Sequence, residues 1–142
     1  MTETTPLRGQ CLCGAVRFEI IPPTKWCAHC HCSMCRRAHG AGYVTWVGVP
    51  EGQLRIIAGE DRLVRYPSSA QASRRFCGAC GSSLFFEGAR WPGEVHVTLG
   101  NIVDKLDRAP QGHAFFDDRA DWVVVNDGLP RFGGPNGNTP LA

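Results

Sequence analysis

Eight cysteines in 142 residues carry the most distinctive chemistry of this chain, and four of them lie within residues 26–40, WCAHCHCSMCRRAHG. Thiolate sulfur favours zinc, and imidazole suits the same metal. Cys30 and Cys32 are two apart, so their side chains leave the same face of an extended segment. Cys32 and Cys35 are three apart, a spacing that one turn of helix returns to one face. A strand that runs into a short helix would therefore present three sulfurs to one point.

The remaining cysteines predict a second metal site and leave one choice open. Two pairs, C-x-C and C-x-x-C, each have a glycine beside them and lead into a strand pattern: Cys11 and Cys13, and Cys77 and Cys80. Four thiolates that close a tetrahedron are typical of structural zinc. Cys27 decides the character of the other site. If Cys27 binds there, four thiolates close that site, and if it points away, three ligands leave a position for water or a substrate thiol.

Disulfides are the competing explanation for so many cysteines, and the sequence disfavours them. C-x-C spacing is too tight for easy bridging. The first residues, MTETTPLR, lack the basic and apolar regions of a secretory signal, and no run of ~18 apolar residues predicts a membrane span. We therefore expect a cytoplasmic protein that is not membrane-bound, where cysteines are ligands more often than bridges. The formal charge of +2, with no clustered basic patch, disfavours a nucleic-acid partner.

The elements that must position these residues read as strands. Seventeen glycines and ten prolines in a chain of one-domain length indicate a turn-rich, mostly-β architecture. A hairpin turn is expected at residues 59–61 and a loop at 67–73. A single domain, 1–142, would have its core at about 9–132, between a loose amino-terminal arm and a mobile tail. Alternating and β-branched residues predict strands at 16–20, 42–49, 54–58, 63–66, 84–87, 95–99, 113–116 and 122–125.

Four segments together resemble the glutathione-dependent formaldehyde-activating enzyme family: GQCLCGAVRF, CHCSMCRRAHG, RRFCGACGSSLFF and HAFFDDRADWVVVNDGLPRF. The match extends over about residues 9–132. It implies a mostly-β, Mss4-like fold of coiled antiparallel sheets with few short helices, which centromere protein V-like domains share. The resemblance also implies two zinc ions. The structural zinc would be bound by Cys11, Cys13, Cys77 and Cys80, and the catalytic zinc by Cys30, Cys32 and Cys35.

The implied activity is that of a carbon–sulfur lyase, which condenses formaldehyde with glutathione or a related thiol to an S-hydroxymethyl adduct. A zinc ion and its three thiolates together carry a net negative charge, which makes the metal a poor Lewis acid. We therefore expect the metal to hold a deprotonated thiol. Two other interpretations remain: a non-enzymatic zinc-binding interaction module, and a lyase for a different thiol adduct. A sulfoxide reductase is set aside because no cysteine follows Cys80.

Arginines and one histidine are the candidate substrate-binding residues. Arg36 and Arg37 follow the last thiol of the triplet, where they would pair with the carboxylates of a peptide-like thiol or remain solvated. By resemblance, His113 occupies the late H-x-F position of the family and lines the pocket. The other histidines are expected to lie off the metal. Strand alternation turns His29 and His31 away from it, His96 points outward from its strand, and His39 makes a structural hydrogen bond.

Overall fold

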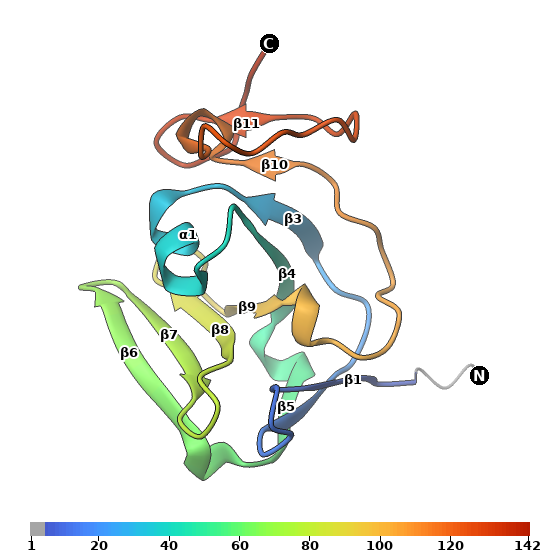
Figure 1. Cartoon of the computed structure of the whole chain (residues 1–142). Helices are drawn as coiled ribbons and strands as arrows, with labels where there is room; N and C mark the ends of the chain where they lie inside the picture. Colours follow the sequence, from blue (N-terminus) through green and yellow to red (C-terminus); the bar gives the residue numbers. More distant parts are fainter. Residues whose placement is uncertain (1–4) are drawn as a thin grey trace.

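The computed structural model describes residues 5–142, which form three β-sheets and one α-helix (Figure 1). A three-stranded sheet, in the order β1-β2-β5, contains Leu7–Gln10, Arg17–Ile20 and Leu54–Ala58. A seven-stranded sheet has the order β10-β3-β4-β9-β8-β7-β6. Its strands in chain order, β3, β4, β6, β7, β8, β9 and β10, are Trp26–Cys30, Val44–Pro50, Leu63–Ser69, Ala72–Cys77, Ser83–Gly88, Glu94–Thr98 and His113–Ala114.

Short elements complete the architecture. β11 and β12 pair near the carboxyl terminus, and single 3₁₀ turns, η1 to η4, follow four strands. The bounds of these elements are Phe132–Gly133, Thr139–Pro140, Glu51–Gln53, Glu60–Arg62, Leu99–Asn101 and Phe116–Asp118. Neighbouring strands are antiparallel except β10 and β3, which confirms the expected mostly-β class. No helix in residues 5–142 has the length and apolarity to cross a membrane.

The two faces of the seven-stranded sheet serve different purposes. One face packs against the three-stranded sheet, and Phe18 of β2 meets Phe85 of β8 edge-on with ring centroids 5.2 Å apart. Val47 and Val97 point into this core, whereas Trp46, which precedes Val47, points to the other face. Because successive residues of a strand alternate between faces, the same strands that build the core also build the walls of a cavity.

The helix α1, Ser33–His39, begins directly after β3 and is closed at both ends by local contacts. The sulfur of Cys32 accepts a hydrogen bond from the Cys35 backbone N–H at 3.3 Å, as a side chain at a helix amino terminus does. Gly40 ends the helix with a φ of 60°, a conformation that glycine adopts without a steric penalty. The predicted transition from strand to short helix is present.

Several predicted boundaries were wrong in the first half of the chain. Residues 7 and 8, assigned to the loose arm, belong to β1, and residues 1–4 of that arm lie outside the described residues. Residues 59–61 do not close a hairpin, because β5 and β6 belong to different sheets and the turn carries the chain from one to the other. The expected loop at residues 67–73 is instead the end of the β6–β7 hairpin, where main-chain pairing at the sheet edge outweighs low β-propensity.

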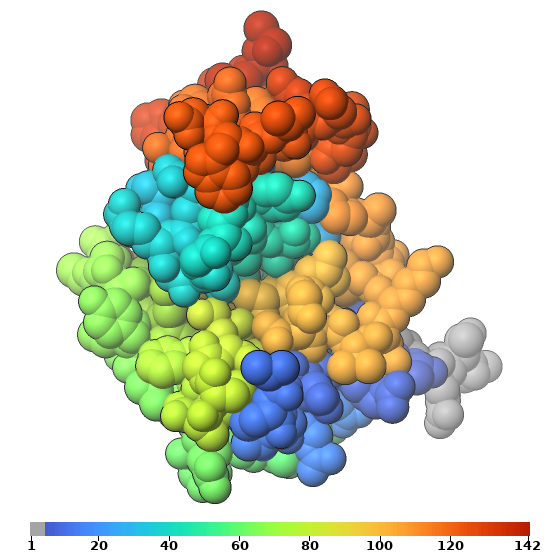
Figure 2. All heavy atoms as spheres, viewed as in Figure 1, coloured from blue at the N-terminus to red at the C-terminus, as the bar shows by residue number. Residues whose placement is uncertain are grey.

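The carboxyl-terminal segment also differs from its prediction. Residues 122–125 are not a strand, since Trp122 is 69% and Val124 is 83% exposed, and the strand expected at 113–116 is only two residues long. The tail, expected to be mobile, folds back so that β11 pairs with β12. Figures 1 and 2 show this orange-to-red segment as a layer over β3 and α1.

Candidate metal centres and the adjoining cavity

Three thiols converge where β3 meets α1. Cys30 ends β3, Cys32 caps α1, and Cys35 lies in the first turn of the helix. Their sulfur atoms lie within 4.8 Å of one another. All three therefore come from six consecutive residues, and their convergence depends on the local change from strand to helix.

Electrostatics at this triplet favour ionisation of one sulfur, that of Cys35. Hydrogen bonds from Cys30 and Cys32 lower the pKa of Cys35 to about 2, and the Trp46 indole and the Arg74 guanidinium add to that effect. The same contacts raise the pKa of Cys30, because only one of three neighbouring thiols is readily ionised in the absence of a cation. A compact set of soft sulfur ligands with one stabilised thiolate fits a zinc ion, which would ionise the other two thiols.

Cys27 does not belong to this group. Its side chain is fully buried in the core between the two sheets, on the face of β3 opposite to Cys30. Burial raises the pKa of the Cys27 thiol to about 11, as an apolar environment does for a group whose charged form it disfavours. The odd spacing from Cys27 to Cys30 explains the separation, since alternate strand residues face opposite ways. Of the two cases that the sequence left open, the geometry therefore fits the one in which Cys27 points away, and the triplet has no fourth cysteine among the described residues.

The second sulfur group has the dimensions of a zinc tetrahedron. It joins the turn before β2 to the turn between β7 and β8, and its members are Cys11, Cys13, Cys77 and Cys80. The Cys11–Cys13 and Cys13–Cys77 sulfur separations are 3.6 Å and 3.9 Å. Zn–S bonds of ~2.3 Å at tetrahedral angles require roughly 3.8 Å between sulfurs. A hydrogen bond from Ser82 lowers the pKa of Cys80 to about 5, which favours the ligating thiolate.

The three-thiol group opens onto a cavity of about 500 Å³ on the sheet face opposite the core. Aromatic rings dominate its walls, with Trp26, Trp46, Phe86 and Trp91 supplied by β3, β4, β8 and the loop after β8. Residues 135–138 of the tail also line it. A largely apolar hollow with a few polar groups is the usual form of a small-molecule site.

Arg74 of β7 is the cation nearest to the thiols in this cavity. One guanidinium nitrogen lies 3.7 Å from the sulfur of Cys35, and the group stacks over Phe86 at 5.1 Å from the ring centroid. Another nitrogen, Nη1, is buried without a hydrogen-bond partner among the described residues. A buried donor without an acceptor is costly, so this nitrogen is suited to an acceptor that a ligand supplies.

His96 also lines the cavity and is held by a buried carboxylate. It is 5% exposed, which corrects the expectation that it points outward; residues on both faces of β9 are covered. Its Nε2 lies 2.9 Å from Glu94, which also accepts hydrogen bonds from the Trp26 indole and the Lys25 ammonium, each at 2.8 Å. Burial lowers the pKa of His96, and the Glu94 contact opposes this only in part. The ring is therefore neutral near pH 7.

The charge of Glu94 follows from the same contacts. Although burial raises its pKa, the hydrogen bonds from Lys25 and Trp26 outweigh that effect and keep the pKa below its usual range. An ionised carboxylate only accepts, so His96 donates its Nε2–H to Glu94 and presents Nδ1 as the basic nitrogen. Glu94 thus fixes both the tautomer and the orientation of the ring.

The arginines predicted to bind substrate lie elsewhere. Arg36 donates to the backbone oxygens of His31 and Asp118 at 3.2 Å and 3.1 Å, so its guanidinium ties α1 to the η4 turn. Arg37 is exposed on the outer side of the helix, and neither residue lines the cavity. In a helix, residues directly after a ligand rotate away from it, which explains why adjacency in sequence misled the prediction.

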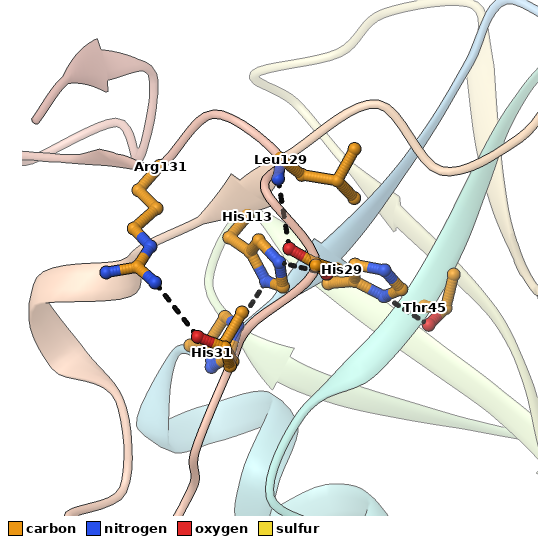
Figure 3. Close-up of polar contacts among 8 residues, drawn as sticks. His29, His31, Thr45, His113, Leu129 and Arg131 are labelled. Atoms are coloured by element: carbon orange, nitrogen blue, oxygen red, sulfur yellow. Dashed lines mark hydrogen bonds and ion pairs between the residues drawn. The ribbon is translucent and has the colours of Figure 1, made fainter.

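His113 likewise does not line the cavity. It is buried behind β3, where it contacts His31 at 2.8 Å and Asp127 at 2.8 Å (Figure 3). Its assignment as a pocket residue is corrected, because the parallel pairing of β10 with β3 places it beside His29, on the face away from Cys30. His29 and His31 also lie off the three-thiol group, as expected.

The sequence contained a usable signal for the residues that were missed. His96 occupies an alternate position to the core valines of a strongly patterned strand, so it belongs to the second face of a sheet that is buried on both sides. The error lay in assigning that face to solvent. Arg74 had no comparable signal, since the sequence shows it only as one of two adjacent arginines ahead of a cysteine pair.

Comparisons with known proteins agree with this architecture. A family model described as glutathione-dependent formaldehyde-activating enzyme matches residues 6–118. A relative from Halomonas elongata, named provisionally as such an enzyme, is 30% identical over 126 residues, which cover 84% of this chain and 80% of the relative. A Schizosaccharomyces pombe protein, named only as an uncharacterized lyase, is 30% identical over 78 residues, 55% of each chain. A crystal structure of a Rhodobacter sphaeroides protein has a TM-score of 0.59 at 28% identity and covers 72% of this chain and 93% of that one.

The opposite orientations of Cys27 and Cys32 generate a prediction about zinc content. Cys27→Ala should keep the full complement of zinc, because this sulfur lies in the core, and should lose only stability through the small void it leaves. Cys32→Ala should lose the zinc of the three-thiol group and keep that of the four-sulfur group. Elemental analysis of the two purified variants measures this difference, and loss of a zinc equivalent from Cys27→Ala would contradict it.

Proposed function

The chain belongs to the glutathione-dependent formaldehyde-activating enzyme family, and we propose that it is a zinc-dependent carbon–sulfur lyase acting on formaldehyde and glutathione or a related thiol. The reaction joins the thiol sulfur to the formaldehyde carbon, while the thiol proton passes to the carbonyl oxygen to give an S-hydroxymethyl adduct. The recognition of the family from four sequence segments is confirmed. The substrate and the metal are the parts that the proposal adds.

The observation that carries the proposal is that three thiols, and not four, open onto a cavity large enough for a peptide-like thiol. Three protein ligands with one open position characterise catalytic zinc, whereas four characterise structural zinc. When bound by Cys30, Cys32 and Cys35, zinc would hold a substrate thiol as the thiolate at neutral pH. The four-sulfur group supports a structural role for a second ion.

Arg74 and Arg90 are the residues we assign to the negative charges of the thiol. Arg74 lies next to the Cys35 sulfur and has an unpartnered buried nitrogen, so it is suited to an acceptor close to the reacting sulfur. Arg90 is exposed at the rim of the cavity, over the Trp91 ring at 5.5 Å, where it can reach a carboxylate farther along the molecule. Guanidinium groups bind carboxylates through paired hydrogen bonds, which gives a peptide-like thiol a defined orientation.

His96 is the residue we assign to the transfer of the proton. Among the described residues that line the cavity, it is the only imidazole, and its Nδ1 is the nitrogen that Glu94 leaves free. His96 Nδ1 would accept the proton that the thiol loses and return it to the oxygen that becomes anionic as the carbon–sulfur bond forms. Glu94 stabilises the ring while it carries the charge. Aromatic walls meanwhile exclude bulk water from the reacting carbonyl.

Exchange between free and adduct forms tests the proposed reaction. At chemical equilibrium, zinc-loaded protein should accelerate the interconversion of formaldehyde, glutathione and the adduct above the unaided rate, as measured by NMR exchange spectroscopy. Cys32→Ser should abolish the acceleration because it removes one of three ligands. Retention of the four-sulfur zinc and of the circular dichroism spectrum serves as the control for folding in this variant.

The two rival functions predict different results in this experiment. A non-enzymatic zinc-binding module would leave the exchange at the rate of the buffer while both zinc ions stay bound. A lyase for a different adduct would accelerate exchange with another small thiol and not with glutathione. The separation of Cys27 from the triplet favours the open site over the module.

Substrate binding by Arg74 generates a second prediction. Arg74→Gln should weaken binding of the thiol and raise its KM by roughly 10-fold or more, since a charge-assisted hydrogen bond contributes about 1.5–3 kcal/mol. Arg37→Gln is the matched control, because it removes an exposed guanidinium outside the cavity and should leave KM unchanged. Saturation kinetics of the two variants provide the measurement, and equal effects would refute the assignment.

Proton transfer by His96 generates a third prediction, on pH dependence. Its pKa is below the usual 6.5, so the basic form should dominate at neutral pH and the wild-type rate should fall as the pH drops through that lowered pKa. The charged groups that face the ring or share the cavity are Glu94, Lys25, Cys35, Arg74 and Arg90.

His96→Gln tests that assignment, because glutamine cannot accept the proton. The variant should lose about 10²-fold in rate, at the lower end for general acid–base catalysis, and should also lose the part of the acidic decline that His96 causes. Rate profiles between pH 5 and pH 8, measured with saturating zinc, distinguish this role from a structural one. A lower rate with an unaltered pH profile would assign His96 to packing alone.

A further inference from the structure

A third group of side chains that could bind a metal lies on the face of β3 away from Cys30. Figure 3 shows two of its members, His29 and His113, beside each other. The group consists of His29 on β3, His113 on β10 and Asp127 in the loop that follows η4, and one ligand atom of each lies within 4.8 Å of the others. We propose that these residues bind a divalent transition-metal ion, such as Zn²⁺, through two imidazole nitrogens and one carboxylate oxygen. This inference does not depend on the proposed lyase activity.

Strand register brings the two imidazoles together. His113 is the direct partner of His29 in the parallel pair β10–β3, so both side chains leave the same face of the sheet. Their ring centroids are 4.8 Å apart with the planes tilted by 31°. Asp127 reaches them from the next loop, with its Oδ2 2.8 Å from Nε2 of His113. Main-chain pairing therefore places two of the three ligands before any metal binds.

Each ligand residue is also held by an outer partner through another atom. Thr45 lies 2.7 Å from Nδ1 of His29, and His31 lies 2.8 Å from Nδ1 of His113. The other carboxylate oxygen of Asp127, Oδ1, accepts the backbone N–H of residue 129 at 3.0 Å. These contacts leave Nε2 of both imidazoles and Oδ2 of the carboxylate as the atoms available to an ion. Outer hydrogen bonds of this kind orient the ligands of metal sites and fix the histidine tautomer.

A small movement would complete the coordination. Bonds of ~2.0–2.2 Å to nitrogen and oxygen place neighbouring ligand atoms roughly 3.0–3.5 Å apart. The Asp127–His113 contact of 2.8 Å must therefore open by a few tenths of an ångström, and Nε2 of His29 must reach the same separation from both atoms. The Asp127 side chain is 40% exposed, so it can move and an ion can enter from solvent. An ion bound at Nε2 of His113 would replace the direct hydrogen bond between this nitrogen and Asp127.

The nitrogen and oxygen ligands distinguish this group from both sulfur groups. Imidazole with carboxylate suits Zn²⁺, Co²⁺ and Ni²⁺, whereas the all-thiol groups favour softer metal ions. An ion here would tie β3 and β10 to the loop that carries Asp127. The same carboxyl-terminal segment continues to residues 135–138, which line the cavity. A metal ion bound at the histidine group would therefore restrict the motion of that wall.

Metal titration of the tag-free, full-length protein tests the proposal. With both sulfur groups loaded with zinc, added Co²⁺ should bind as one further equivalent whose visible spectrum shows d–d bands without sulfur-to-metal charge transfer. Asp127→Asn should weaken this binding by more than ~10-fold, the smallest loss expected even for an outer partner. Asp121→Asn, a change at an exposed residue of the same loop, is the matched control and should bind as the wild type does.

Two further measurements keep the test decisive. Thr45→Val should lower the affinity for the third equivalent of metal by about 10–100-fold without removing a ligand. Because Thr45 lies outside the loop of Asp127, this variant tests the site even if Asp127→Asn disturbs that loop. The imidazole ¹⁵N resonances of His29 and His113 should shift when Zn²⁺ is added. The proposal is wrong if no saturable third equivalent binds, or if Asp127→Asn and Asp121→Asn bind it equally. In either case the group is a metal-free hydrogen-bonded chain.

Discussion

The alternation of side chains across the seven-stranded sheet is the constraint on which the rest of this structure depends. The central strands are covered on both faces, so their side chains are divided among the core, the cavity and the histidine group. On β3, Cys27 enters the core, Cys30 faces the cavity and His29 faces His113. A shift of one residue in the register of β3 would exchange these roles, because the period of a strand is two.

Burial of charge beside the cavity is possible only because the charged groups share partners. Glu94, 8% exposed, accepts from Trp26, Lys25 and His96, and an isolated carboxylate at such a position would be strongly disfavoured. The same three hydrogen bonds orient two walls of the cavity. One buried carboxylate thus couples the packing of an aromatic wall to the ionisation of an imidazole, so the electrostatics and the shape of the cavity cannot be changed independently.

The two sulfur groups differ in how the fold assembles them. The triplet is local, since six residues and one change from strand to helix bring its atoms together. The four-sulfur group is long-range, because it joins turns that are more than sixty residues apart in sequence. A metal ion at the second group would close a large loop and stabilise the contact between the two sheets. A metal ion at the first would depend on a segment that forms its own geometry, which is the arrangement a reactive site requires.

Local pattern explains what could be predicted. The cysteine spacings, the alternating strands and the turn into α1 are properties of neighbouring residues, so the mostly-β class, most strands of the first half and the two sulfur groups followed from the sequence. Tertiary structure decided the rest. Which face of β3 carries Cys27, whether Arg36 or Arg74 enters the cavity, and where His113 lies depend on strand order and on the parallel pair β10–β3. Those contacts join residues tens of positions apart, and no short-range period encodes them.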